Sequence, residues 1–233
     1  MPMPAADVEI LRRVGYFRSL PDTELRRLAA GCRTRTLRTN ETLFEEGDAC
    51  RGLFIVAEGT VAVRQISFRG REQVFHTEGP GATLGEAPLF DRGGYVASAV
   101  AMTSARAVFL PRSQVIALCQ RRPEVALAML QTMAGRVRRF AELVADLAFR
   151  PVPERLARHL DTLQAERTDT EVRLTLTHAQ LAARLGTVRE LVVRALRQLE
   201  RSGVIARRRS TIVIRDPRRL AALARGEDLA AET

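Results

Sequence analysis

The spacing of hydrophobic positions changes character along the chain. Leu11, Val14 and Phe17 recur at helical intervals, which predicts short helices over residues 7–30. From residue 34 to 110 the apolar runs are short and separated by glycines, a pattern typical of a small antiparallel barrel or roll. The strands predicted within it are 53–56, 60–63, 73–75 and 105–109. The N-terminal half is therefore expected to be a β-roll with a helical arm.

A long helix is predicted from Pro123, which suits a first helical turn, to about Phe149. Its apolar residues alternate steps of four and three, as in the heptad seam of a coiled coil. The seam positions are Ala126, Leu130, Met133, Val137, Phe140, Val144 and Leu147. We expect this helix to pair with a second copy of the chain; the alternative is one helix packed on its own barrel.

Charged residues flank this seam and are expected to lie in solvent. They are Arg136, Arg138, Arg139, Glu142 and Asp146. Pro151 and Pro153 then interrupt the helix and predict a hinge.

Two helix starts follow each other closely near residue 180. Thr177 with Gln180 and Thr187 with Glu190 each match the spacing of a capping box. Gly186 lies between them, where a tight turn needs a residue without a Cβ. The segment therefore predicts a helix-turn-helix.

The second of these helices is predicted to have one apolar and one polar face. The apolar positions are Val188, Val192, Ala195 and Leu199. The opposite face carries Arg189, Glu190, Val193, Arg194 and Arg197. Arginine can bond a guanine edge, glutamate can accept from a cytosine amino group, and valine can touch a thymine methyl. The first four of these residues are therefore predicted to read bases, whereas the alternative is a merely solvated helix face.

A basic hairpin is predicted after this helix, with strands 204–207 and 211–215 around an arginine-rich turn. Such a hairpin is well placed to meet phosphates, like a wing. The predicted phosphate contacts are Thr177, His178, Thr187, Arg197, Arg207, Arg208 and Arg209.

Charge and composition agree with a nucleic-acid partner. The net charge is +10, and residues 174–225 alone hold twelve arginines against three acidic residues, a net +9. No apolar run is long enough for a membrane helix and no secretory signal is evident, so we expect a cytoplasmic protein without a membrane partner. Phosphate-cradling, nucleophile-elbow and metal-spacing motifs are missing, so an enzyme is not expected.

Cysteines and histidines offer no strong metal signal. Cys32, Cys50 and Cys119 lie far apart without a CxxC pair, so reduced thiols and no metal site are predicted, with a redox role as the alternative. His76 is interpreted as an ordinary strand-end residue, with ligation of haem iron as the alternative.

The chain resembles the CRP/FNR family of transcription regulators, named after the cyclic AMP receptor protein and the fumarate-nitrate reductase regulator. The likeness extends over nearly the whole chain, through GDACRGLFIVAEGTVAV, GEAPLF, DLAF and, most specifically, GTVRELVVRALRQLE. It implies a cyclic-nucleotide-binding-type roll, a dimerising helix, a winged helix domain and RNA polymerase as a partner. It also implies base reading by Arg189, Glu190 and Arg194, which half-sites of GTGA type would suit. Val193 departs from the small or hydroxylated residue usual in the family.

The resemblance also implies an effector pocket, in which this chain departs from the family's pattern. The corresponding residues are Gly85, Glu86, Val96, Ala97, Phe140 and Ala141. Members that bind cyclic AMP carry Arg-Ser or Arg-Thr at Val96–Ala97 and Thr-Ser at Phe140–Ala141. Loss of a cation opposite an anionic phosphate costs on the order of several kcal/mol, so cyclic AMP is not expected to bind.

Other effectors stay open. The clustered cysteines of FNR-type oxygen sensors are missing. Haem, another small metabolite and no ligand at all are the alternatives. Glu86 stands at the family's ribose-binding position, and its alternative role is to satisfy backbone amides.

The sequence thus predicts an α+β protein with four segments. They are an arm and β-roll sensor domain over 1–122, a dimerisation helix over 123–150, a winged helix-turn-helix domain over 151–225 and a tail over 226–233. The predicted function is sequence-specific binding of double-stranded DNA at an inverted repeat, as a homodimer under a signal other than cyclic AMP. The alternative is a constitutive or architectural DNA-binding protein with a ligand-free roll.

Overall fold

The computed structural model describes residues 6–91, 93–165, 171–173, 177–208 and 211–227. The chain divides into two compact units, made mainly of residues 1–140 and 141–233. Their combination of helices and sheets confirms the predicted α+β class. The arm and arginine turn are described only in part, and Arg209 lies outside the described residues.

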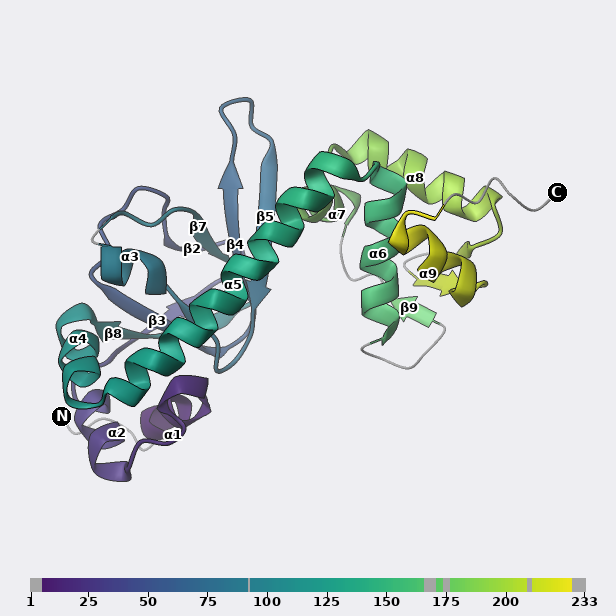
Figure 1. Ribbon diagram of the computed structural model, residues 1–233. Coiled ribbons are helices and arrows are strands. Elements are labelled where there is room, and N and C mark those ends of the chain that lie inside the picture. Colours follow the sequence, from purple (N-terminus) through teal and green to yellow (C-terminus); the bar gives the residue numbers. More distant parts are fainter. Residues whose placement is uncertain (1–5, 92, 166–170, 174–176, 209–210, 228–233) are drawn as a thin grey trace. The chain divides into compact units, whose positions relative to one another are not determined.

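The N-terminal unit begins with the predicted helical arm: α1 (Ala6–Arg13), a 3-10 turn (Gly15–Phe17) and α2 (Asp22–Ala29). The roll that follows consists of two four-stranded antiparallel sheets (Figure 1). One has the order β1 (Arg33–Leu37), β8 (Ala105–Pro111), β3 (Gly52–Glu58) and β6 (Thr83–Leu84). The other has the order β2 (Thr42–Phe44), β7 (Ser98–Ala101), β4 (Val61–Ile66) and β5 (Glu72–Glu78).

The strand β3 lies at the centre of this unit. It pairs along most of its length with β8, from Gly52 opposite Pro111 to Val56 opposite Ala107. Leu53 and Ile55 face a core shared with the arm and α4 (Arg112–Arg121), whereas Val56 faces the core between the sheets. Because both faces are covered, β3 is apolar almost throughout.

Helix α5 (Pro123–Phe149) has the bounds that the sequence predicts. Its first turns are anchored by Val125 and Met129, which are buried in the core of the arm and roll. Short α3 (Glu86–Asp91) also belongs to this unit, where Glu86 and Leu89 are buried. Figure 1 shows α5 leaving α4 and running beside the roll.

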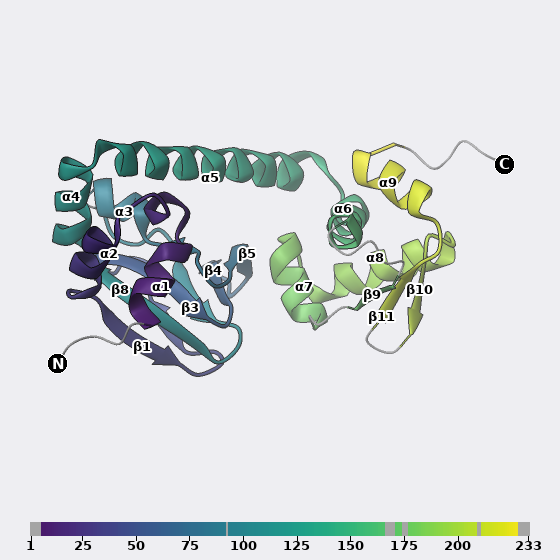
Figure 2. The same cartoon turned by 90° about the horizontal axis from the view of Figure 1, so that it is seen from below.

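The C-terminal unit contains a winged helix-turn-helix (Figure 2). Its helices are α6 (Val152–Ala165), α7 (His178–Leu185), α8 (Arg189–Arg201) and α9 (Pro217–Arg225). A three-stranded sheet has the order β10 (Ile205–Arg208), β11 (Thr211–Ile214) and β9 (Glu171–Arg173). The hairpin β10–β11 matches the predicted wing within one residue at all four strand ends, whereas β9 has no predicted counterpart.

The ends of α7 and α8 test the predicted capping. Thr177 and Gln180 form the expected capping box, and Gly186 ends α7 in the left-handed conformation at φ 63°. The second predicted box is wrong, because α8 begins after Val188 and has no side-chain hydrogen bond at its N-cap. Thr187 still belongs to the turn, where its amide donates to the Ala182 carbonyl at 2.9 Å, and the extended Val188 occupies the capping position instead.

Candidate nucleic-acid interface and ligand pocket

Helix α8 presents a polar face formed by the predicted base-reading residues. Arg189, Glu190 and Arg194 are exposed and Val193 is half-buried. The opposite face is buried in the C-terminal core, through Val192, Ala195, Leu196 and Leu199. Because this apolar face is held by α6 and the sheet, the arginines and Glu190 project from a supported helix.

The structure divides the predicted phosphate contacts into several environments. Thr177 is an N-cap whose hydroxyl accepts from the Gln180 amide at 3.2 Å. Next to it His178 is half-buried, as is Thr187 in the turn. Arg197 and Arg208 are exposed. Both were predicted to meet phosphate, as was Arg207, which is also exposed.

Arg207 differs from Arg197 and Arg208 because it forms an ion pair with Glu200. Its Nε and Nη2 donate to Oε2 of Glu200 at 2.9 and 2.6 Å, and its amide donates to Oε1. The hydrogen bond from Arg207 lowers the pKa of Glu200 below its usual range. Arg207 is thus held against the end of α8, where it braces the wing.

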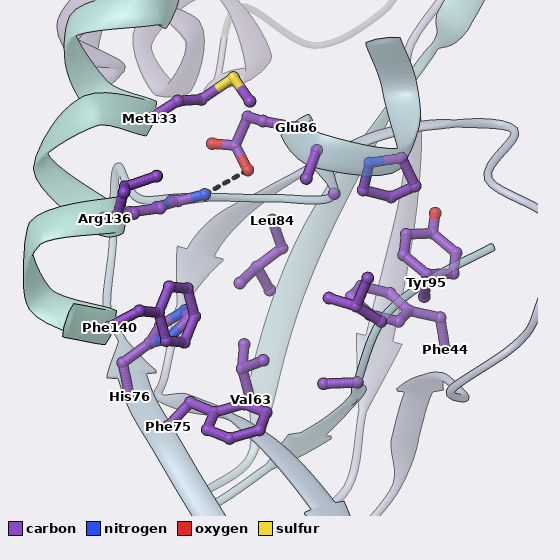
Figure 3. Close-up of a pocket in the computed structure, with 16 residues that line it drawn as sticks. Phe44, Val63, Phe75, His76, Leu84, Glu86, Tyr95, Met133, Arg136 and Phe140 are labelled. Atoms are coloured by element: carbon purple, nitrogen blue, oxygen red, sulfur yellow. Dashed lines mark hydrogen bonds and ion pairs between the residues drawn. The ribbon is translucent and has the colours of Figure 1, made fainter. Parts of the chain in front are cut away.

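A cavity of about 160 Å³ lies in the N-terminal unit between the roll and α5. Its walls are mostly aromatic and aliphatic (Figure 3). Of the effector-pocket residues predicted by resemblance, Gly85, Glu86, Val96, Ala97 and Phe140 line it. Ala141 is exposed and is not among the lining residues. Five of the six residues implied by resemblance therefore line the cavity.

Arg136 and Glu86 form a buried ion pair at one end of the cavity. The Glu86 side chain is 1% exposed and that of Arg136 is 17% exposed. The guanidinium donates through Nη1 to Glu86 and through Nη2 to the Thr83 carbonyl at 2.6 Å. The Thr83 hydroxyl donates to the other Glu86 oxygen. Figure 3 shows the pair joining α5 to α3.

Two expectations about this pair are wrong. Arg136 was predicted to lie in solvent, but it is buried because Glu86 provides a countercharge on the roll. Glu86 was expected, as an alternative to ribose binding, to accept hydrogen bonds from backbone amides. Its oxygens instead accept from two side chains, those of Arg136 and Thr83. A sequence signal was present: Arg136 lies three residues after Met133 and four before Phe140, on the same face of the helix.

His76 also lines the cavity, beside the ring of Phe140 at a centroid distance of 6.2 Å. Burial, reinforced by Arg136 and Arg139, lowers the pKa of His76 to about 4. The imidazole is therefore uncharged at neutral pH, and its 3.6 Å approach to Glu78 is not an ion pair.

An exposed stripe runs along α5, defined here by Leu127, Leu130, Val137 and Val144. These side chains are 62, 60, 66 and 64% exposed. Three of them belong to the predicted seam, as does Leu147, which is 39% exposed. Met133 and Phe140, also in that predicted seam, line the cavity. The apolar residues of α5 thus lie on two surfaces, the exposed stripe and the wall of the cavity.

None of the three cysteines takes part in a disulfide. Cys32 is buried, while Cys50 and Cys119 are half-buried free thiols. Across the described residues, no group of three or more His, Cys, Asp or Glu side chains is arranged to hold a metal ion. Within that same part of the chain, no helix combines the length and hydropathy needed to cross a bilayer.

Comparison with known proteins agrees with both halves of the fold. Residues 34–122 match the family model of the cyclic nucleotide-binding domain, and residues 154–223 match that of the Crp-like helix-turn-helix domain. The CRP-like cAMP-activated global transcriptional regulator of Mycobacterium tuberculosis is 33% identical over 223 residues, covering 93% of this chain and 99% of the relative. The Cyclic AMP receptor protein of Thermus thermophilus is 34% identical over 185 residues, covering 79% and 84%.

Among solved structures, FixK2 from Bradyrhizobium japonicum has the same fold, with a TM-score of 0.71 at 23% identity and coverage of 86% of this chain and 99% of that one. The fold and the exposed face of α8 define a helix-turn-helix transcription regulator with a cyclic-nucleotide-binding-type domain. The chain belongs to the CRP/FNR family.

Proposed function

We propose that this regulator binds an inverted-repeat DNA site as a homodimer, under the control of a signal other than cyclic AMP. The observation that carries the proposal is the polar face of α8, where Arg189, Glu190 and Arg194 are exposed above a buried apolar face. Such a helix can enter the major groove and hydrogen-bond to base edges. RNA polymerase is the protein partner that family membership suggests.

The exposed stripe of α5 supports the homodimer. Leu130, Val137 and Val144 are each at least 60% exposed and repeat every seven residues along one helix, and Leu127, equally exposed, lies three residues before the first of them. A second copy of the same helix offers a matching stripe, and pairing would bury both. Two recognition helices in a symmetric dimer require half-sites about 34 Å apart on one face of the duplex.

The cavity supports a signal other than cyclic AMP. Val96 and Ala97 line it without any side-chain hydrogen-bond donor. Arg136, the cation of the cavity wall, already contacts Glu86 and Thr83. A cyclic phosphate would therefore lose its hydration without gaining a free cationic partner.

Selection from random duplexes tests the DNA part of the proposal. The purified full chain is expected to enrich an inverted repeat with half-sites of GTGA type, because Arg189, Glu190 and Arg194 suit that sequence. Enrichment of a single, non-repeated half-site would contradict dimeric reading. Absence of any enriched sequence would contradict base reading by α8.

Two arginine substitutions separate base reading from phosphate contact. Arg194→Ala is expected to cost about 1–3 kcal/mol on the selected site and to relax the preference at one base pair. Arg208→Ala is expected to weaken all sequences alike and to reduce the slope of log affinity against log salt by about one. The DNA affinities of both variants are measured by fluorescence anisotropy on specific and random duplexes over a salt series.

Arg18→Ala is the matched control, since Arg18 is an exposed arginine of the N-terminal unit. It is expected to leave the specificity ratio unchanged. Equal losses on specific and random DNA for Arg194→Ala would remove Arg194 from the base-reading set.

A further inference from the structure

The walls of the cavity in the N-terminal unit are mostly apolar. Phe44 stacks on Tyr95 with ring centroids 3.7 Å apart, and Phe75 meets Phe140 edge-on at 5.6 Å. Aliphatic side chains also line the cavity. They are Val63, Leu84, Met133 and Val137. Rings that already pack on each other lose little freedom when a ligand arrives, so the space between them is preorganised.

The charges at the cavity wall are balanced within the protein. The negative charge of Glu86 faces the positive charge of Arg136, and the two side chains are 1% and 17% exposed. His76 is uncharged at neutral pH, because burial lowers its pKa to about 4. The Tyr95 hydroxyl donates to the Gly52 carbonyl at 3.3 Å. Among the described lining residues, therefore, no charge is left unmatched for an ionic ligand.

The volume of about 160 Å³ limits the size of the occupant. An apolar cavity of about 150 Å³ stays dry and takes up benzene, whereas pockets for drug-sized ligands measure about 300–1,000 Å³. A nucleotide or a haem macrocycle is larger than this space. A molecule of one ring would fill the space as it stands.

We propose that this cavity is a binding site for a small, uncharged, apolar molecule of about the size of one aromatic ring. This inference rests on the proposed function, because it names the chemical class of the signal that replaces cyclic AMP. Met133, Val137 and Phe140 bring three side chains of α5 to the site, and Val137 also belongs to the exposed stripe. The occupant would therefore touch the helix that we propose to dimerise.

Calorimetric titration of the full chain with toluene and benzoate tests the proposal, because the two probes share a ring and differ in charge. Toluene is expected to bind saturably, one per chain. Benzoate is expected to bind at least about tenfold more weakly, since its carboxylate would be desolvated without a free partner. Equal or tighter binding of benzoate would overturn the proposal.

Two cavity-filling variants localise the site. Ala97→Leu and Val63→Phe add carbon atoms to lining positions, and each is expected to weaken toluene binding at least about tenfold. Ala145→Leu makes the first change at an exposed position outside the cavity and is expected to leave binding unchanged. Circular dichroism confirms the fold of each variant. Undiminished toluene binding in both folded cavity variants would overturn the site.

A parallel titration with cyclic AMP separates this inference from the proposed function. Tight, saturable cyclic AMP binding would overturn the proposed signal and this ligand class together. No binding of toluene or cyclic AMP, by a protein that still selects an inverted repeat, would overturn this inference alone.

Discussion

Leu130→Asp is expected to convert the dimer into a monomer. Leu130 is 60% exposed on α5, so the carboxylate is harmless to a single chain but would be buried without a partner in a paired helix. Light scattering should report half the mass. Affinity for the inverted repeat should fall about 100-fold or more, because two linked half-site contacts become separate events.

Gln131→Asp is the matched control, since Gln131 is an exposed neighbour on the same helix outside the stripe. It should leave both mass and affinity unchanged. Leu130 is a sharper test than Phe140, which also lines the cavity and contacts Phe75. A Leu130→Asp protein of unchanged mass would show that the stripe does not hold two chains together.

Arg136→Met is expected to lower the free energy of unfolding of the N-terminal unit by about 3–5 kcal/mol. The substitution preserves much of the aliphatic volume but leaves Glu86, which is 1% exposed, without its cationic partner. Urea unfolding followed by tyrosine fluorescence measures the effect. The chain has no tryptophan, and Tyr16 and Tyr95 both lie in this unit, so the signal follows this unit by itself.

Glu86→Gln completes a double-mutant cycle. In the Arg136→Met background it is expected to restore part of the lost stability, because a neutral amide is cheaper to bury than an unpaired carboxylate. Arg138→Met, at an exposed arginine of the same helix, controls for the change of side chain. Additive effects of the two pocket substitutions would contradict the ion-pair interpretation.

The DNA-binding half could be predicted because its signals are local. The spacing of Val192, Ala195 and Leu199 identifies the buried face of α8, and the left-handed turn at Gly186 separates the two helices. The capping box at Thr177 could likewise be predicted, because Thr177 and Gln180 lie three residues apart in the sequence. The box expected at Thr187 failed because an identical spacing does not determine where the turn ends and the helix begins.

Contacts between distant segments could not be predicted in the same way. Glu200 and Arg207 meet because the chain reverses between α8 and the wing, so a predicted phosphate contact has a carboxylate partner. Strands β1, β2, β6 and β7 were missed for a related reason. Their exposed or very short stretches lack clear alternation, and their pairing partners lie far along the chain.

The sequence by itself determined the class of the protein, the bounds of α5 and the composition of the polar face of α8, because helical periodicity and turn chemistry act over a few residues. Tertiary structure decided how the apolar residues of α5 are shared. A repeat of three and four shows which side chains lie on one side of a helix, but not what lies opposite them. The roll takes Met133 and Phe140 into the cavity and buries Arg136 against Glu86, while Leu130 and Val144 stay exposed.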